Sequence, residues 1–171
     1  MKIRLATKGD CDYIKTNADQ IYFKTEKEFW KKNYYRISKK ECLNLISKNE
    51  LYVLANHNEI LGFVVIKKIN SKIITFSMLT VIEKHHNKGY GNFLIKYIFD
   101  KANSERIETV LIEILCAKHW GHPQKEFLTK WYTNLGFSFI NNFSFESKYP
   151  THARFMKCEL EFKLYAKTIW K

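Results

Sequence analysis

One turn of the sequence has the residue types of an anion-binding site. The stretch from Glu83 to Ile95, EKHHNKGYGNFLI, places Gly89 and Gly91 after a basic, histidine-containing run and before apolar residues at helical spacing. The first N–H groups of a helix have no partner inside it, and the helix dipole adds partial positive charge there. Glycines let the backbone approach a ligand closely. The turn can therefore bind a phosphate group, or it can simply connect a strand to a helix.

Two common phosphate motifs do not match this turn. No Gly-Lys-Ser/Thr sequence follows it, so it is not a Walker loop. Leu94 stands where the dinucleotide-binding motif G-x-G-x-x-G has its third glycine. A G-x-G pair alone is weak evidence for a phosphate site. The helices and strands around the turn must therefore show whether it binds an anion or only connects a strand to a helix.

The patterns around the turn predict a mixed α/β order of elements. Asp10 is a plausible cap for the first helix, and the three strands after residue 50 are expected to form an antiparallel meander. The helix after residue 122 is expected to place one apolar face inward, with Gly136 as its terminator. The expected elements are a strand at 3–7, a helix at 8–23, one or two helices within 25–49, strands at 51–56, 60–68 and 71–81, a helix after the turn, a strand at 109–117, a helix at 123–137 bearing Phe127, Leu128, Trp131, Tyr132 and Leu135, and a strand at 153–165.

Length and composition favour a folded, single domain over residues 1–171. Hydrophobic residues make up 46% of the chain, which excludes a disordered chain. The net charge of +12 attracts anions and argues against polycationic substrates, although a lysine-rich composition can also reflect an AT-rich genome.

The N-terminus lacks a signal-peptide core and no apolar run approaches membrane-spanning length, so we expect no membrane partner. The cysteines are scattered without a C-x-x-C pair, which favours reduced thiols and a cytoplasmic location: Cys11, Cys42, Cys116 and Cys158.

Two separated motifs, HNKGYG in the turn and WYTNLGF in the helix after residue 122, resemble those of the Gcn5-related N-acetyltransferases. HNKGYG, from His86 to Gly91, resembles the acyl-CoA signature Q/R-x-x-G-x-G/A; MLTV, before it, looks like the strand that pairs with pantetheine; and WYTNLGF, after it, is similar to the family's Tyr-x-x-x-Gly-Phe. The resemblance extends from Ile3 to about Tyr165 and includes the order of elements. It implies a mixed, mostly antiparallel sheet of six to seven strands flanked by about four helices.

The resemblance also implies acetyl-CoA as co-substrate and assigns residues to it. Leu79 and Val81 would pair with pantetheine through main-chain groups, and the Leu79 N–H would polarise the thioester carbonyl. Lys125 would reach phosphate or pantetheine oxygens. The signature's first position is His86 instead of Gln or Arg, so Lys88 is expected to help balance the diphosphate charge. The diphosphate itself would lie on the amides of His86, Asn87, Lys88, Gly89, Tyr90, Gly91 and Asn92.

Two residues are candidates for proton transfer. Tyr132 matches the family tyrosine that protonates the leaving thiolate, and a phenol pKa near that of a thiol suits this role, although Tyr132 can equally be a core residue. Glu113 interrupts an apolar strand and is the candidate base, or else a glutamate on a solvent-facing edge. His119 and His122 can relay a proton, but no carboxylate or cysteine completes a metal site with them, so no metal is predicted.

The resemblance places the acceptor beside residues 22–40, an aromatic and strongly basic segment. We therefore expect a small-molecule or peptide amine, apolar or acidic near its nitrogen and not polycationic, acetylated by direct attack in a ternary complex. The alternatives are a catalytically inactive binding module of the same fold for CoA or RNA, and a nucleotide-binding protein that uses the same turn. Binding of nucleic acid is the less favoured of these interpretations, and a homodimer is left open.

Overall fold

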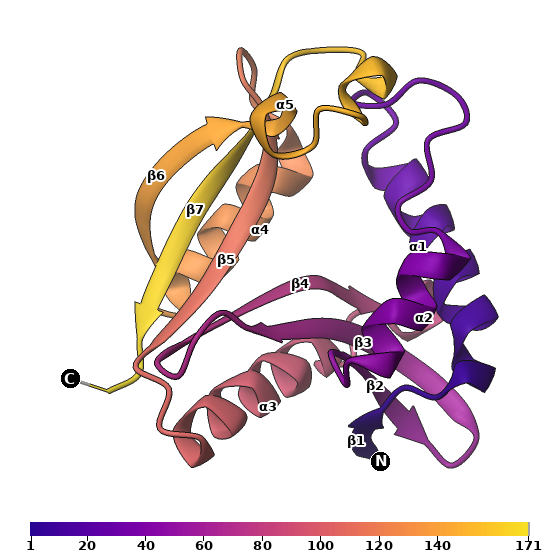
Figure 1. The fold of residues 1–171 in the computed structure, drawn as a ribbon, viewed down its shortest axis with the longest axis vertical. Coiled ribbons are helices and arrows are strands. Elements are labelled where there is room, and N and C mark those ends of the chain that lie inside the picture. Colours follow the sequence, from indigo (N-terminus) through magenta and orange to yellow (C-terminus); the bar gives the residue numbers. More distant parts are fainter. Residues whose placement is uncertain (171) are drawn as a thin grey trace.

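A seven-stranded sheet runs through the computed structural model, which describes residues 1–170 (Figure 1). Its strand order is β1-β2-β3-β4-β5-β7-β6, and every neighbouring pair is antiparallel except β4 with β5. This confirms the predicted mixed α/β fold. The strands are β1 (Lys2–Leu5), β2 (Leu51–Asn56), β3 (Glu59–Lys68), β4 (Ile73–Val81), β5 (Thr109–Ala117), β6 (Ser138–Ser144) and β7 (Leu160–Thr168).

Helices cover both faces of the sheet, which is why β3 is buried continuously from Ile60 to Ile66. Leu61 and Val64 pack with α3, whereas Phe63 and Val65 pack with α1 and α2. The helices are α1 (Cys11–Thr25), α2 (Lys39–Ser47), α3 (Tyr90–Ser104), α4 (Pro123–Asn134) and the short α5 (Phe145–Lys148).

The sheet splits between β4 and β5. These strands pair in parallel only from Ile73 to Phe76 of β4, opposite residues 109–112 of β5. Beyond Phe76, β4 contains a bulge. Ser77 pairs with Val65 of β3 and Thr80 with Phe63, so β4 has one more residue between these two pairs than β3 has. Met78, within the bulge, has a φ of 50°. β5 meanwhile stays paired with β7 as far as Ala117. The two strands therefore diverge and leave a V-shaped opening in the middle of the sheet (Figure 1).

The first helices differ from the prediction. α1 begins at Cys11, and Asp10 does not cap it with its side chain. Instead the Asp10 carboxylate accepts hydrogen bonds from Arg4 at 2.7 Å and from the Thr7 amide at 2.7 Å. Chiefly the hydrogen bond from Arg4 lowers the pKa of Asp10 to about 2, so this carboxylate is ionised and ties β1 to the start of α1.

Residues 26–37, predicted as helical, form no α-helix. α2 starts only at Lys39, where Ser38 and Glu41 make a capping box: the Ser38 hydroxyl accepts from the Glu41 amide at 3.1 Å, and the Glu41 carboxylate accepts from the Ser38 amide at 2.7 Å. We call residues 26–37 the α1–α2 connection.

The α1–α2 connection is joined to the chain just before β7. Trp30 and Met156 form an isolated antiparallel bridge. The Lys31 amide donates to the Phe155 carbonyl at 2.7 Å, and the Lys157 amide donates to the Phe29 carbonyl at 2.8 Å. Residues 153–159 are thus engaged with this connection, which is why the last strand begins at Leu160 and not at the predicted 153.

The buried face of α4 is also not the predicted one. Phe127 is 65% exposed, while Lys125 and Tyr132 are buried. Tyr132 therefore lies inward as expected from the spacing, but Phe127 does not share its environment.

Candidate active site

The glycine turn has a strained conformation that only certain residues tolerate. Gly89 is the N-cap of α3 with a φ of 79°, and Asn87 has a φ of 61°. Both values lie in the left-handed region that favours glycine and, to a lesser degree, asparagine. The turn follows a short 3₁₀ turn at Glu83–His85 after β4, so the start of α3 is held beside the opening between β4 and β5.

The amides of this turn are available to a ligand. Within residues 1–170, none of the six amides from Asn87 to Asn92 donates a hydrogen bond to another group of the protein. Together with the positive end of the helix dipole, these N–H groups make a site for an anion.

His86 is a correction to the predicted set of amides. Its own amide already donates to the Glu83 carbonyl at 3.1 Å. Its ring Nε2 donates to the carbonyl of Val81 at 2.8 Å. His86 therefore fixes the turn against the end of β4, and its amide does not face a ligand.

Lys88 is the exposed cation of the turn. Lys84 pairs with Glu59 at 2.5 Å, whereas Lys88 makes no ion pair in the part of the chain that the structure describes. Lys88 is thus free to approach an anion bound at the start of α3.

The edge of β4 that faces the opening carries main-chain groups without a strand partner. The Ile82 amide donates to the Leu61 carbonyl at 2.9 Å, so Ile82 faces β3 and the neighbouring Val81 faces away from it. The Val81 carbonyl accepts a hydrogen bond from His86, which leaves the Val81 N–H on the open side. Leu79 lies within the bulge, beyond the last residue of β4 that pairs with β5.

Tyr132 lies at the point where the two strands separate. Its ring packs edge-on against Phe76, the last residue of β4 that pairs with β5, with 5.8 Å between the ring centroids. Its side chain is 4% exposed, and the hydroxyl makes no hydrogen bond to residues 1–170. Burial, with a smaller contribution from the nearby Tyr22, raises the pKa of Tyr132, so the phenol keeps its proton at neutral pH.

Glu113 lies on the opposite face of β5 from Tyr132. Its neighbours Ile112 and Ile114 belong to the core cluster that contains Tyr132, so the alternation of the strand directs Glu113 away from that cluster. Its carboxylate accepts a hydrogen bond from Lys148 of α5. The structure does not bring the predicted acid and the predicted base together.

Lys125 is a second correction. Its ammonium donates to the carboxylate of Glu26, and the two residues are 7% and 1% exposed. Trp30 Nε1 donates to the other oxygen of Glu26 at 2.9 Å. Although burial by itself raises the pKa of Glu26, the positive charges of Lys125 and Arg36 outweigh it and lower that pKa. Lys125 therefore joins α4 to the end of α1, and its ammonium is engaged by Glu26 instead of being free for phosphate or pantetheine oxygens.

We expect Lys125→Met to destabilise the protein by roughly 3–5 kcal/mol, because it leaves the buried Glu26 carboxylate without its counter-ion. Urea unfolding followed by circular dichroism measures the change. The matched control is Lys130→Met on the exposed part of the same helix, which should change stability by less than about 0.5 kcal/mol. The double variant Glu26→Gln/Lys125→Met should recover more than half of the loss, and failure to recover any would mean that packing of the Lys125 stem, not charge, explains it.

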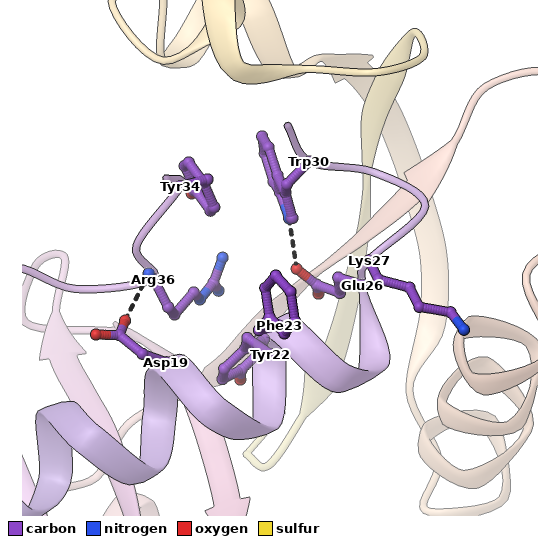
Figure 2. A pocket seen from close by; sticks show the side chains of 8 residues that line it. All are labelled: Asp19, Tyr22, Phe23, Glu26, Lys27, Trp30, Tyr34 and Arg36. Carbon is purple, nitrogen blue, oxygen red and sulfur yellow. Dashed lines mark hydrogen bonds between the residues drawn. The ribbon is translucent and has the colours of Figure 1, made fainter. Parts of the chain in front are cut away.

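A small pocket lies between the end of α1 and the α1–α2 connection (Figure 2). Aromatic rings form much of its wall, with Trp30 and Tyr34 stacked at 3.9 Å between centroids. Its lining residues are Asp19, Tyr22, Phe23, Glu26, Lys27, Trp30, Tyr34 and Arg36. The sequence pointed to this segment, but it did not identify Glu26 or Arg36. The available signal was that Arg36 is one of few arginines in a chain whose positive charge is nearly all lysine.

The two histidines of the predicted proton relay are paired with glutamates. His119 Nε2 lies 3.1 Å from Glu159, and His122 Nε2 lies 3.5 Å from Glu28. Residues 1–170 contain no group of three or more His, Cys, Asp or Glu side chains arranged to hold a metal ion. None of the helices in the same range combines the length and apolar composition needed to cross a membrane.

Solved structures with this fold are numerous, and several contain coenzyme A. The chain resembles yncA, a putative acetyltransferase from Salmonella typhimurium with acetyl-CoA, at 16% identity and a TM-score of 0.70, covering 100% of this chain and 95% of that one. An N-acetyltransferase from Staphylococcus aureus Mu50 gives 15% identity and a TM-score of 0.70, with 99% and 98% covered.

A longer protein, N-acetylglutamate synthase from Neisseria gonorrhoeae with coenzyme A and N-acetyl-glutamate, matches with 18% identity and a TM-score of 0.68; 99% of this chain covers 35% of that chain. No curated protein sequence matches the chain. The family model described as "Acetyltransferase (GNAT) family" matches residues 16–137. This match includes the glycine turn, the diverging strands and Tyr132, and the chain therefore belongs to the GNAT acetyltransferase family.

Proposed function

We propose that this protein transfers an acetyl group from acetyl-CoA to a primary amine by direct attack within a ternary complex. The observation that carries the proposal is the row of six unpartnered amides at the start of α3, next to an opening whose β4 edge is also unpaired. A diphosphate fits the first feature, and a pantetheine arm pairing like an added strand fits the second. The solved relatives that contain CoA or acetyl-CoA support the same co-substrate.

In the proposed complex, the amides from Asn87 to Asn92 bind the diphosphate and Lys88 adds positive charge. The Val81 N–H and the main chain of Leu79 bind the pantetheine arm. The Leu79 N–H is the proposed donor that polarises the thioester carbonyl, because Leu79 lies in the bulge, where β4 has no pairing with β5. This set differs from the predicted one by the loss of the His86 amide and of Lys125.

Tyr132 is the proposed acid. The acceptor nitrogen bonds to the carbonyl carbon, the carbon–sulfur bond breaks, and Tyr132 donates its proton to the sulfur. Burial raises the pKa of this phenol, so it holds the proton that the thiolate needs, and the raised pKa also makes it a weaker acid than a free phenol. Glu113 lies on the other face of β5, and Glu26 is held ionised by two cations, so we assign the proton of the amine to solvent water instead of to either carboxylate.

Titrating the protein with acetyl-CoA during thermal unfolding tests the proposal. At 100 times Kd, a ligand that binds only the folded state stabilises it by about 2.7 kcal/mol, which is a readily measured shift in Tm. We expect this shift with acetyl-CoA and with CoA, and release of free thiol when a panel of primary amines is added. Stabilisation by ATP but not by CoA would identify a nucleotide-binding protein. Stabilisation by RNA alone, lost steeply with added salt, would identify a binding module.

A further inference from the structure

The guanidinium of Arg36 is a half-buried cation without a carboxylate partner. Its backbone amide donates to Asp19 at 2.8 Å, while its side chain makes no ion pair with residues 1–170 and has the Tyr34 hydroxyl as a polar neighbour. Nε is sealed from solvent and unpaired. A charged donor left in this state is costly, and most buried polar groups in proteins find a partner. The side chain is therefore arranged for something that the protein itself does not supply.

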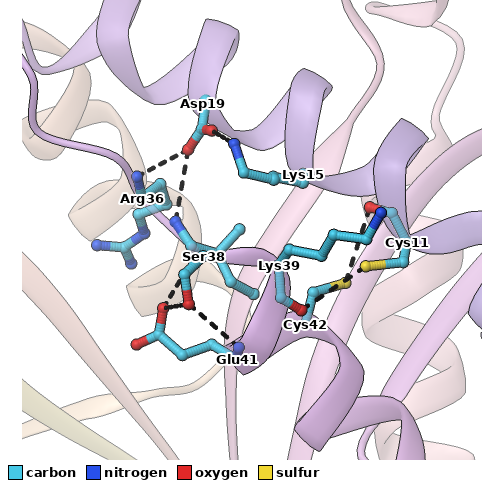
Figure 3. A network of polar contacts seen from close by, with 9 residues as sticks. Cys11, Lys15, Asp19, Arg36, Ser38, Lys39, Glu41 and Cys42 are labelled. Atoms are coloured by element: carbon cyan, nitrogen blue, oxygen red, sulfur yellow. Dashed lines mark hydrogen bonds and ion pairs between the residues drawn. The ribbon is translucent and has the colours of Figure 1, made fainter.

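The neighbouring carboxylates are already engaged. Asp19 accepts from the amides of Arg36 and Ile37 at 2.8 and 3.4 Å with one oxygen, and from Lys15 at 2.7 Å with the other (Figure 3). Glu26 is bound by Lys125 and Trp30. The pocket consequently contains one positive charge that no carboxylate within bonding distance balances.

The guanidinium is also oriented for a planar ligand. Its Cζ lies 4.4 Å from the centroid of the Tyr22 ring, so an aromatic face supports it from one side. Figure 2 shows the side chain directed into the space between Tyr22 and Tyr34, toward Trp30 and Glu26. A guanidinium held in this way presents its N–H edge, which binds a carboxylate through two parallel hydrogen bonds.

The same pocket lies on the side of the molecule where β4 and β5 diverge. Glu26 in its wall is bonded to Lys125 of α4, the helix that bears Tyr132, and Tyr22 packs against the same core cluster as Met78 of the β4 bulge. A small acceptor whose anionic group lies against Arg36 therefore has its remaining atoms near the fork of β4 and β5, where Tyr132 lies.

We propose that the acceptor is a small primary amine that also carries a carboxylate, as an amino acid does, and that Arg36 binds this carboxylate. The inference rests on the proposed function. Trp30 and Tyr34 then contact the apolar part of the acceptor, and Arg36 determines specificity without touching the reacting bond. Phosphate shares the same anionic chemistry, so the experiment must separate the two.

The test compares matched amines on the wild-type protein and on Arg36→Met. The probes are the twenty common amino acids, their carboxamides, an aminoalkyl phosphate of similar length and the corresponding plain amine. For the best amino acid, we expect kcat/KM in the wild type to exceed that of its carboxamide by on the order of 10- to 100-fold. In Arg36→Met this preference should disappear through a higher KM, with Arg36→Lys recovering part of it and Arg106→Met, an exposed control, leaving it unchanged.

Two further measurements, the Kd of acetyl-CoA and Tm, show whether a negative result contradicts the role of Arg36 or the proposed acetyltransferase function. The Kd of acetyl-CoA should be the same in the wild type and in Arg36→Met, and Tm should be unchanged or higher, because the substitution removes a half-buried charge that makes no ion pair with the described residues. A lower Tm in Arg36→Met with equal rates on acids and amides would show a purely structural role and overturn the inference. Faster reaction with the phosphate or the plain amine would also overturn it, while leaving the acetyltransferase function intact. Absence of acetyl-CoA binding in the wild type would instead refute the proposed function.

Discussion

Replacing Gly89 by glutamate is expected to weaken the binding of acetyl-CoA by about three orders of magnitude. Gly89 has a φ of 79°, which costs other residues about 1 kcal/mol or more. The larger effect is electrostatic, because the added carboxylate stands among the amides that we assign to the diphosphate. At about 4 Å and an effective dielectric constant near 20, one pair of like charges repels by about 4 kcal/mol. We expect Kd to rise by about 1,000-fold, measured by isothermal titration calorimetry.

Two variants isolate the charge from the backbone strain. A Cβ at Gly89 meets no atom within 4 Å, so Gly89→Ala tests the strain alone and should weaken binding by less than about 10-fold. Gly9→Glu adds the same charge at an exposed glycine far along the chain and should leave Kd unchanged. Unaltered acetyl-CoA binding by a folded Gly89→Glu variant would mean that the diphosphate lies elsewhere.

Tyr132→Phe is expected to lower kcat by about 100-fold, the low end of what a positioned general acid contributes. The Kd of acetyl-CoA should not change, because the ring and its contacts with Phe76 and Phe137 remain. Stability should change little, since the lost hydroxyl makes no hydrogen bond to the described residues. Steady-state kinetics with free-thiol detection, together with thermal unfolding, separates these effects.

The pH dependence adds a second readout for Tyr132. A raised pKa keeps the phenol protonated past its ordinary value near 10, so the wild-type rate should not decline through ionisation of this group below that pH. Tyr52→Phe removes a buried hydroxyl from the same core cluster on a strand away from the opening and should leave kcat unchanged. Equal rates for the wild type and Tyr132→Phe would assign the proton of the leaving thiolate to another donor.

The local parts of the site were predictable from the sequence. Glycine spacing indicates where a backbone can turn with positive φ, and Gly89 does so at the start of α3 as expected. Alternation and turn residues similarly predicted β2, β3 and β4 as a meander, and the antiparallel pairing confirms it. The connection after Asn56 is two residues long, one shorter than predicted, because β3 begins at Glu59. These features depend on residues that are close in sequence, so a short stretch of sequence is enough to predict them.

The parts that depend on distant contacts were not predictable. Lys125 has the character of an exposed cation until it is seen that Glu26, which directly follows α1, is buried against it. Residues 26–37 have the composition of a helix, but Trp30 pairs with Met156 instead. Arg36 gives no sign in the sequence that its Nε is sealed from solvent without a partner. Each case requires knowing which segments meet across the opening.

The link between the α1–α2 connection and the chain before β7 has a consequence for how the molecule assembles. One of its bonds, from Lys157 to the Lys27 carbonyl, spans 130 positions of sequence. Closing a loop of that length has a high entropic cost, so contacts of this kind form after shorter-range ones. The proposed coenzyme site at β4 and the start of α3, which is built from adjacent segments, can therefore form early in folding. The aromatic pocket is completed only when the chain before β7 has paired with the α1–α2 connection.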